Sequence, residues 1–165
     1  MSSGSLGQGI SCAVGMALSS KHFGSGFNVY TVLGDGELEE GQVWEAAMFA
    51  SSKGLSNLTA FVDNNNLQID GTVEEVNSPY PIDKKFEAFG WHTIVIDGHD
   101  FDQIEAAVNE AKTVDKPVCI IANTVKGKGV SYMENQVGWH GSAPNDELAA
   151  KALEELDAQL NELMA

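Results

Sequence analysis

The feature that most constrains this chain is a series of short apolar runs, each of which ends in a polar loop. Residues 29–33, 58–62 and 118–122 are almost entirely apolar and lack the alternation of a half-exposed strand. Strands that are buried on both faces of a parallel sheet show this pattern. Between the runs, apolar residues recur at helical spacing, at about 6–21, 40–53 and 101–114. The sequence therefore predicts an α/β fold, a doubly wound, mostly parallel sheet with helices on both faces.

The remaining segments extend the same alternation. A short helix is expected at 81–89, a strand at 93–96 and a last helix from about 146, whereas the Asn-rich segment 63–72 is expected to be a loop. Four leucines of the last helix recur at helical spacing, and we expect them to pack in the core: Leu153, Leu156, Leu160 and Leu163.

Charge and cysteine content exclude several classes of function. Acidic residues number 24 against 9 basic ones, and this formal charge of −15 argues against nucleic acid or an anionic membrane as a partner. Cys12 and Cys119 both lie in apolar stretches, so we expect two buried free thiols and a cytoplasmic protein. No signal peptide is apparent, and no apolar run reaches membrane-spanning length.

The two most polar loops follow consecutive predicted strands. Gly34, Asp35 and Gly36 come first, and two glycines around a carboxylate let the backbone approach a bulky anion closely. The helix that follows adds unpaired N–H groups and the positive end of its dipole. Taken alone, this tripeptide is better explained as a tight turn. Since ligands of such sheets lie beyond the carboxyl ends of the strands, the loop is a candidate anion site.

The second loop, 63–66, reads Asp-Asn-Asn-Asn. Mg²⁺ prefers oxygen ligands and shares them readily with phosphates, so Asp35, an asparagine of this loop and a loop carbonyl could hold it together with a diphosphate and water. An Asn-rich turn is the alternative, because asparagine tolerates the left-handed conformation. Together, the two loops predict a two-sided site for a metal and an anion.

Four segments resemble, in order, successive motifs of the transketolase family: GSLGQGISCAVGMALSSK, GDGELEEGQVWEAAMFAS, FVDNNNLQIDG and WHGSAPNDEL. Asp35 and Asn65 stand thirty positions apart, and Gly-Asp-Gly followed at that distance by Asn is similar to the thiamine-diphosphate fingerprint. The resemblance covers nearly the whole chain. It implies a single thiamine-diphosphate-binding domain over residues 1–165 that lacks the family's usual upstream segment.

The resemblance also implies roles for individual residues. Asp35, the side chain of Asn65 and the carbonyl of Leu67 match ligands of Mg²⁺ (or Ca²⁺ or Mn²⁺). Asn65 is chosen over its neighbours because the family spacing D-x-N-x-x-x-x-D-G sets it in register with Asp63 and Asp70. The Gly34–Gly36 turn matches the diphosphate contact, which is made by the N–H of Gly36.

Three further matches lie outside the two loops. Gly4 and Leu6 match positions against the aminopyrimidine ring of the cofactor, although Ser5 replaces a proline that is often found between them. His140 matches a histidine near the diphosphate and the reacting carbon. Glu40 matches a carboxylate at the subunit interface that is associated with proton communication between paired sites.

In this family the cofactor lies between two domains of different chains, and this chain resembles only the domain that holds the diphosphate. The resemblance implies a subunit of a split transketolase, as in the pentose phosphate pathway. Such a subunit moves two-carbon ketol units between sugar phosphates, is active only with a pyrimidine-binding partner subunit, and self-associates. One alternative is another ketose-processing thiamine enzyme, similar to 1-deoxyxylulose-5-phosphate synthase or dihydroxyacetone synthase; the GDGELEEGQVWEA string favours transketolase.

A second alternative is a non-catalytic module that binds the cofactor or assembles with a partner. The absence of the family's upstream histidines favours this alternative. Asp35, Asn65 and His140, which are all present, oppose it.

Overall fold

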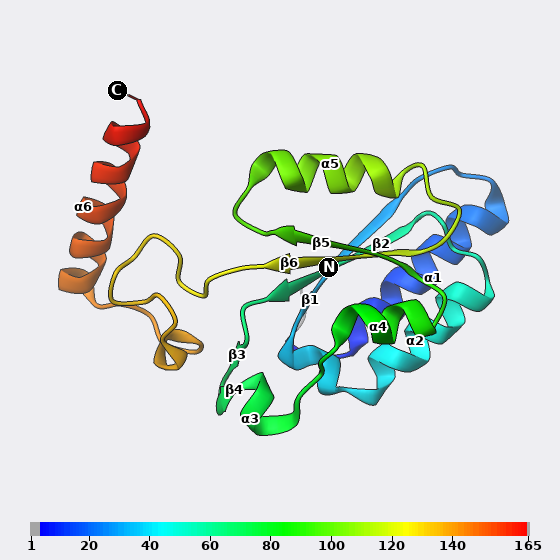
Figure 1. Cartoon of the computed structure of the whole chain (residues 1–165), viewed down its shortest axis with the longest axis horizontal. Coiled ribbons are helices and arrows are strands. Elements are labelled where there is room, and N and C mark those ends of the chain that lie inside the picture. The colour runs from blue at the N-terminus through cyan, green and yellow to red at the C-terminus, as the bar shows by residue number, and fades with distance from the viewer. Residues whose placement is uncertain (1–3, 165) are drawn as a thin grey trace.

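The computed structural model describes residues 4–164 and contains one parallel four-stranded sheet (Figure 1). Neighbouring strands follow the order β1, β2, β6, β5, and each pair is parallel. The strands are β1 (Val29–Gly34), β2 (Leu58–Asn64), β5 (His92–Asp97) and β6 (Val118–Asn123). The predicted parallel α/β fold is confirmed, and the apolar runs form its strands.

Helices cover the two faces unequally. On one face lie α1 (Gln8–Phe23), α2 (Gly41–Ser52) and α4 (Ile82–Ala88), whereas α5 (Phe101–Ala111) lies on the other (Figure 1). The alternating side chains of β6 belong to two cores: Cys119 and Ile121 to the first, Val118, Ile120 and Ala122 to the second. Strand β6 is thus buried on both faces, as its unbroken apolar run predicted.

Strand β1 is less covered than its apolar sequence predicts. It forms an edge of the sheet, and α5 packs against β5 and β6. Two side chains of β1 are exposed, Tyr30 to 46 % and Val32 to 70 %.

The segment predicted as a loop contains regular structure. Strands β3 (Leu67–Gln68) and β4 (Gly71–Thr72) pair as a small antiparallel hairpin, and a short helix, α3 (Val73–Asn77), follows directly. The side chain of Thr72 accepts a hydrogen bond from the N–H of Glu75 and so caps α3. Such short strands leave no hydrophobic periodicity in the sequence, which is why the hairpin was not predicted.

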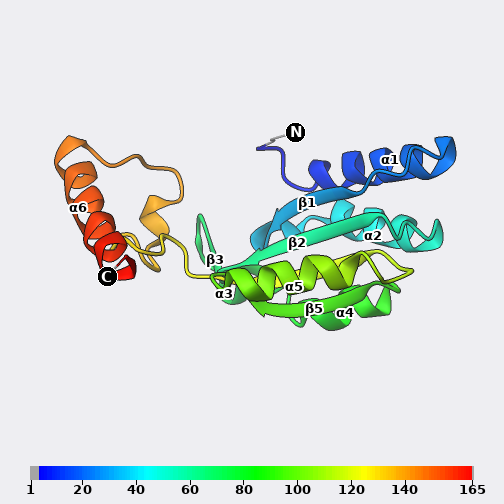
Figure 2. The same ribbon diagram turned by 90° about the horizontal axis from the view of Figure 1, so that it is seen from above.

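Residues 125–164, which we call the C-terminal arm, lie beyond the carboxyl ends of the strands (Figures 1 and 2). The arm contains a short 3₁₀ helix, η2 (Val137–Trp139), and α6 (Asp146–Leu163), which the side chain of Asn145 caps. None of the described residues of α6 is buried. The expected core packing of the leucine stripe is wrong, because α6 lies against the preceding loop instead of the sheet: Leu153, Leu156, Leu160 and Leu163 are 42–86 % exposed.

Both cysteines are free, as predicted, but their surroundings differ. Cys119 is buried in β6, and burial raises the pKa of its thiol. Cys12 is exposed, so its predicted burial is wrong, because its position on α1 faces a groove beside β1. Within residues 4–164, every helix is too short or too polar to cross a membrane.

Candidate functional site

The register of the sheet brings the two polar loops together. Gly34 at the end of β1 pairs with Asp63 at the end of β2, and the N–H of Asp35 donates to the carbonyl of Asp63 at 3.2 Å. Because both strands are parallel, their carboxyl ends meet at one edge of the sheet. A short 3₁₀ helix, η1 (Gly36–Glu39), leads from β1 to α2.

Asp35 is the buried carboxylate of this edge, with only 2 % of its surface exposed. It accepts hydrogen bonds from the N–H groups of Gly36, at 2.8 Å, and Asn66. Burial raises the pKa of Asp35, and the nearby charge of Asp63 adds to this, while the backbone donors act in the opposite direction. The ion pairs found within residues 4–164 all involve other carboxylates, so a buried negative charge here lacks a cationic partner.

Asn65 and Leu67 lie in the loop that closes over Asp35. The amide oxygen of Asn65 accepts from the N–H of Leu67 at 3.0 Å, and its Nδ2 donates to Asp63 Oδ2 at 3.2 Å. The other carboxylate oxygen of Asp63 accepts from the hydroxyl of Thr124, which directly follows β6. Asp63 therefore orients Asn65 and also fixes the chain where it leaves the sheet. In the sequence, Asp63 only sets the register of the motif, and this orienting role was not predicted.

Asn66 has a positive φ of 60°, and its N–H donates to the carboxylate of Asp35. Its side-chain Oδ1 is buried and has no hydrogen-bond partner within the described residues. A buried oxygen without a partner is costly unless a ligand satisfies it.

Glu37 ties the N-terminal segment to the end of β1, a role that the sequence analysis missed. Its carboxylate accepts from the N–H of Gly7 at 2.8 Å and from the N–H of Gly34 at 3.2 Å. Gly4 and Leu6 lie on this tied segment, and Leu6 is 53 % exposed, which leaves its side chain open to a ligand.

Gly36 lies beneath the β3–β4 hairpin. A Cβ added at Gly36 would stand 2.8 Å from Oε1 of Gln68, so only glycine fits without a shift of that side chain. The hairpin, unseen in the sequence, is what makes this approach close.

Glu40 is exposed and directly precedes α2. It lies against the N-terminal segment, since a Cβ added at Gly7 would stand 3.0 Å from the Cβ of Glu40. The neighbouring Glu39 has a buried Oε1 without a hydrogen-bond partner among residues 4–164. Desolvation raises the pKa of Glu39, and the charges of Asp35 and Glu40 raise it further. Three carboxylates therefore stand close together at this edge.

His140 lies in the C-terminal arm, directly after η2, with an exposed side chain. Its N–H donates to the carbonyl of Val137 at 2.9 Å. Within residues 4–164, no hydrogen bond joins His140 to Asp35 or Asn65. The structure thus gathers the residues of the two loops and of the N-terminal segment, and it carries His140 on a separate element.

The arm is attached firmly at its root. The N–H of Thr124 donates to the carbonyl of Asn64 at 3.1 Å, and the N–H of Val125 donates to Nε2 of His99 at 2.8 Å. A Cβ added at Gly98 would stand 2.4 Å from Cγ2 of Thr124, so the β5–α5 loop also closes tightly on the root. Residues at the end of β2 and in the β5–α5 loop therefore both contact the first residues after β6, where the arm leaves the sheet.

A groove of about 460 Å³ runs between α1 and β1 and borders the site at Glu37. Its lining includes Cys12 and Met16 of α1 and Tyr30 and Val32 of β1. The groove follows the edge of the sheet and does not open over Asp35.

The donor set at the carboxyl edge suits a metal that shares its ligands with an anion. Residues 4–164 contain no cluster of three or more His, Cys, Asp or Glu side chains that could hold a metal alone. A buried carboxylate, an amide and loop carbonyls match the way Mg²⁺ binds through one or two carboxylates and substrate phosphates. Fold and site together define a parallel α/β domain with a buried carboxylate and two polar loops at the carboxyl edge of its sheet.

Comparison with known proteins narrows this class. Residues 1–161 match the family model described as transketolase, thiamine diphosphate binding domain. The chain is 47 % identical over 160 residues to the 6-deoxy-6-sulfo-D-fructose transketolase subunit SqwG of Clostridium sp. (strain MSTE9), a match that covers 96 % of this chain and 58 % of that protein. It is 41 % identical over 164 residues to human transketolase, covering 97 % of this chain and 26 % of the human protein.

A solved structure agrees with these sequence matches. The crystal structure of transketolase from Campylobacter jejuni superposes with a TM-score of 0.88 at 34 % identity, over 93 % of this chain and 25 % of that one. The chain belongs to the transketolase family and corresponds to its thiamine-diphosphate-binding domain. It spans a little over half the length of SqwG and about a quarter of the full-length enzymes.

Proposed function

We propose that this chain supplies the diphosphate and Mg²⁺ half of a transketolase active site that transfers two-carbon ketol units between sugars. The observation that carries the proposal is the buried, unpaired carboxylate of Asp35 beside the Asn65–Leu67 loop. Its raised pKa means that the fold alone does not compensate its charge, and a divalent cation would do so.

The residues present fit the cofactor that the family description names. Asp35, the side chain of Asn65 and the carbonyl of Leu67 would hold Mg²⁺, or Ca²⁺ or Mn²⁺ in its place, and the Gly34–Gly36 turn would contact the diphosphate. Among residues 4–164, the buried Oδ1 of Asn66 has no hydrogen-bond partner beside this turn, as expected where a ligand completes the site. When bound, thiamine diphosphate supplies an electron sink for cleavage of the carbon–carbon bond.

The chain's own residues bind and orient. The acidic cluster around Asp35 repels a diphosphate unless a metal intervenes, so binding should depend on a divalent cation. Glu37 fixes the segment that carries Gly4 and Leu6, which would face the aminopyrimidine ring. His140 would donate a hydrogen bond to a diphosphate oxygen or to the reacting sugar, and Glu40 would lie at an interface between subunits.

The active site is completed by a partner in this proposal. SqwG is named as one subunit of a transketolase, and so is a relative from Phocaeicola vulgatus that belongs to an apulose-4-phosphate transketolase and is 38 % identical over 167 residues. We expect the partner to be a pyrimidine-binding transketolase subunit, and we expect copies of this chain to associate through the Glu40 region.

The names of the same two relatives suggest the substrate class. SqwG is named for a ketose that carries a sulfonate, and the Phocaeicola vulgatus protein is named for a ketose that carries a phosphate. We propose a ketose with an anionic tail, in the first place a sugar phosphate. Lys126 and Lys128 of the arm are the basic residues nearest to His140 on its N-terminal side along the sequence and could meet such a tail.

The decisive experiment is a coupled ketol-transfer assay of the chain with and without a pyrimidine-domain subunit of a split transketolase. Xylulose 5-phosphate and 6-deoxy-6-sulfofructose serve as donors, with thiamine diphosphate and Mg²⁺ present. We expect transfer only in the assembled complex. Transfer by the rigorously purified chain alone would overturn the partner requirement. Cofactor binding by a complex that transfers neither donor would favour a non-catalytic module.

A further inference from the structure

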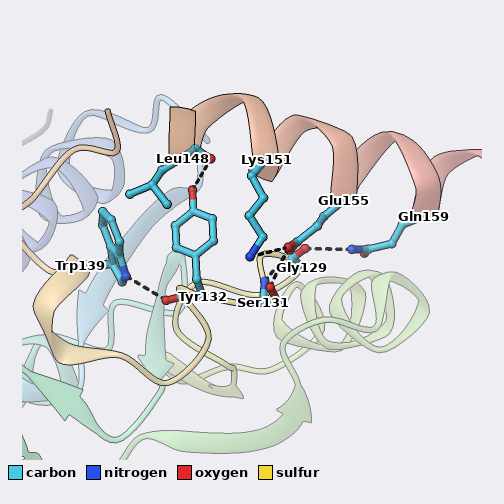
Figure 3. A network of polar contacts seen from close by, with 8 residues as sticks. All are labelled: Gly129, Ser131, Tyr132, Trp139, Leu148, Lys151, Glu155 and Gln159. Carbon is cyan, nitrogen blue, oxygen red and sulfur yellow. Dashed lines mark hydrogen bonds and ion pairs between the residues drawn. The ribbon is translucent and has the colours of Figure 1, made fainter. Parts of the chain in front are cut away.

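The C-terminal arm contains a polar network that the proposed function does not use (Figure 3). The N–H and the hydroxyl of Ser131 each donate to one carboxylate oxygen of Glu155, both at 2.7 Å. One turn further along α6, Nε2 of Gln159 donates to the carbonyl of Gly129 at 2.8 Å. Two turns of α6 therefore hold the loop 129–131 along one side of the helix.

The same side of α6 contacts the next residue of the loop. The hydroxyl of Tyr132 donates to the carbonyl of Leu148 at 2.7 Å, and the ammonium of Lys151 lies 5.5 Å from the centre of the Tyr132 ring. Figure 3 shows the side chains of Lys151, Glu155 and Gln159 directed toward the loop from one face of the helix, and the carbonyl of Leu148 facing the hydroxyl of Tyr132.

From this loop the contacts continue to the candidate histidine. The indole N–H of Trp139 donates to the carbonyl of Tyr132 at 2.9 Å, and the two rings meet edge to face at 5.3 Å. Trp139 directly precedes His140 in the chain. The backbone of His140 is thus connected to α6 through two residues, Trp139 and Tyr132.

Glu155 is the one carboxylate among the residues of this network that Figure 3 labels. A carboxylate accepts hydrogen bonds more strongly than a neutral oxygen does, and here both of its oxygens accept from one residue. Lys151 lies 3.8 Å from Oε1 and supports the ionised state. By contrast, the carboxylate of Glu154, the preceding residue, is exposed and makes no hydrogen bond or ion pair within residues 4–164.

We propose that Glu155 is a positioning residue. Its carboxylate binds Ser131 and so docks the 129–132 loop on α6. The docked loop in turn fixes the segment that carries His140. The inference rests on the proposed function, because docking of the loop on α6 affects catalysis only through the proposed role of His140. The docking itself can be tested without any activity.

The first measurement is amide hydrogen exchange in the assembled complex for wild type, Glu155→Gln, Glu155→Asp and the matched control Glu154→Gln. We expect Glu155→Gln to speed exchange at Ser131 by about tenfold or more, because the charged acceptor with two accepting oxygens is replaced by a neutral amide with one, and to speed exchange at 137–140 as well. Glu155→Asp should recover part of the protection. Equal exchange in the two glutamine variants would overturn the proposal.

The second measurement is ketol transfer by the same variants. We expect Glu155→Gln to lower kcat by about three- to tenfold with little change in the affinity for thiamine diphosphate, and Glu154→Gln to match wild type. A Glu155→Gln variant with fast exchange and wild-type kcat would overturn the link to His140. A wild-type complex without any transfer would instead contradict the proposed function, and the exchange experiment would still decide whether Glu155 holds the loop.

Discussion

The sheet with its packed helices and the C-terminal arm are stabilised in different ways. Residues 4–124 surround two hydrophobic clusters, and side chains such as Leu58, Val62 and Ile120 are fully buried there. The arm has no buried residue in α6 and is held mainly by hydrogen bonds at its surface. Burial of a large apolar side chain contributes about 1.5–3 kcal/mol, whereas a typical hydrogen bond contributes about 0.5–1.5 kcal/mol net.

This difference separates the two parts of the candidate site. The proposed metal and diphosphate residues stand on strand ends whose position the core fixes, whereas His140 follows a segment held by a part-buried hydrogen bond within the arm. Elements with few buried apolar contacts open at low free-energy cost. The arm is therefore the part of the site that a partner or a substrate can most easily move.

The same chemical change should have very different consequences in the two regions. Leu58 is 0 % exposed in β2, and Leu58→Ala should lower the free energy of unfolding by about 2–5 kcal/mol, because it leaves a cavity in the core. Leu160 is 53 % exposed on α6, and Leu160→Ala should change the free energy of unfolding by less than about 0.5 kcal/mol. Urea denaturation of both variants measures this contrast, and equal losses would show that α6 is buried in solution.

The buried charge of Asp35 should matter more to binding than to the fold. Asp35→Ala in the assembled complex should weaken metal-dependent binding of thiamine diphosphate by about a hundredfold or more, since it removes the charged ligand and leaves the diphosphate repelled by its neighbours. Isothermal titration calorimetry with and without Mg²⁺ measures the affinity, with Asp115→Asn as an exposed control. Undiminished metal-dependent affinity would refute the assignment of Asp35 as a ligand.

His140 should show a catalytic effect without a structural one. His140→Ala in the reconstituted complex should lower kcat by at least about tenfold, equivalent to about 1.4 kcal/mol of barrier, while the affinity for the cofactor falls less. Steady-state kinetics at saturating cofactor separates these effects. A loss explained wholly by weaker cofactor binding would make His140 a binding residue, and wild-type turnover would leave it a purely structural one.

The contributions of Glu155 and Asp35 to the stability of the two regions should change with pH in opposite directions. Hydrogen bonds from the side chain and then the backbone of Ser131 hold the pKa of Glu155 below its ordinary value. Its stabilising contribution is therefore complete above the unfolded pKa of about 4.3 and is lost as the pH falls through the lower folded pKa. Burial raises the pKa of Asp35, so its contribution is complete below the unfolded value of about 3.9 and is lost as the pH rises through the folded pKa.

Carboxyl NMR titration of the two side chains measures these effects, which are the smallest expected here. The control for the arm is Glu155→Gln, in which the amide signal of Ser131 should lose its dependence on pH. A midpoint for Glu155 above that of a model peptide would contradict the docked geometry.

The sequence allowed prediction of the sheet body because its signals are local. Unbroken apolar runs marked β1, β2 and β6, and the polar residues after Leu33 and Val62 marked the ends at which the two loops meet. The same reasoning failed for α6, since its leucine stripe has the periodicity of a core helix although the helix lies away from the sheet. Periodicity shows that a face is apolar and does not show what covers it.

The contacts that orient the site were beyond sequence reasoning for a different reason. The hydrogen bonds of Glu37 to Gly7 and of Asp63 to Thr124 join residues that are 30 and 61 positions apart, and no spacing rule predicts such pairs. The β3–β4 hairpin consists of two-residue strands, too short to leave a pattern. The candidate ligands could therefore be predicted from the sequence, whereas the residues that orient them could not.

The order of strands in the sheet has a consequence for how the protein is made. Strand β6 is the last along the chain, yet it lies between β2 and β5, and it pairs Thr59 with Val118 across a long stretch of the sequence. Until residues 118–123 have left the ribosome, β5 of the nascent chain has no strand of this sheet to pair with. Because such distant pairings must close before they contribute, assembly of this sheet is slow and leaves apolar edges open to aggregation until β6 is inserted.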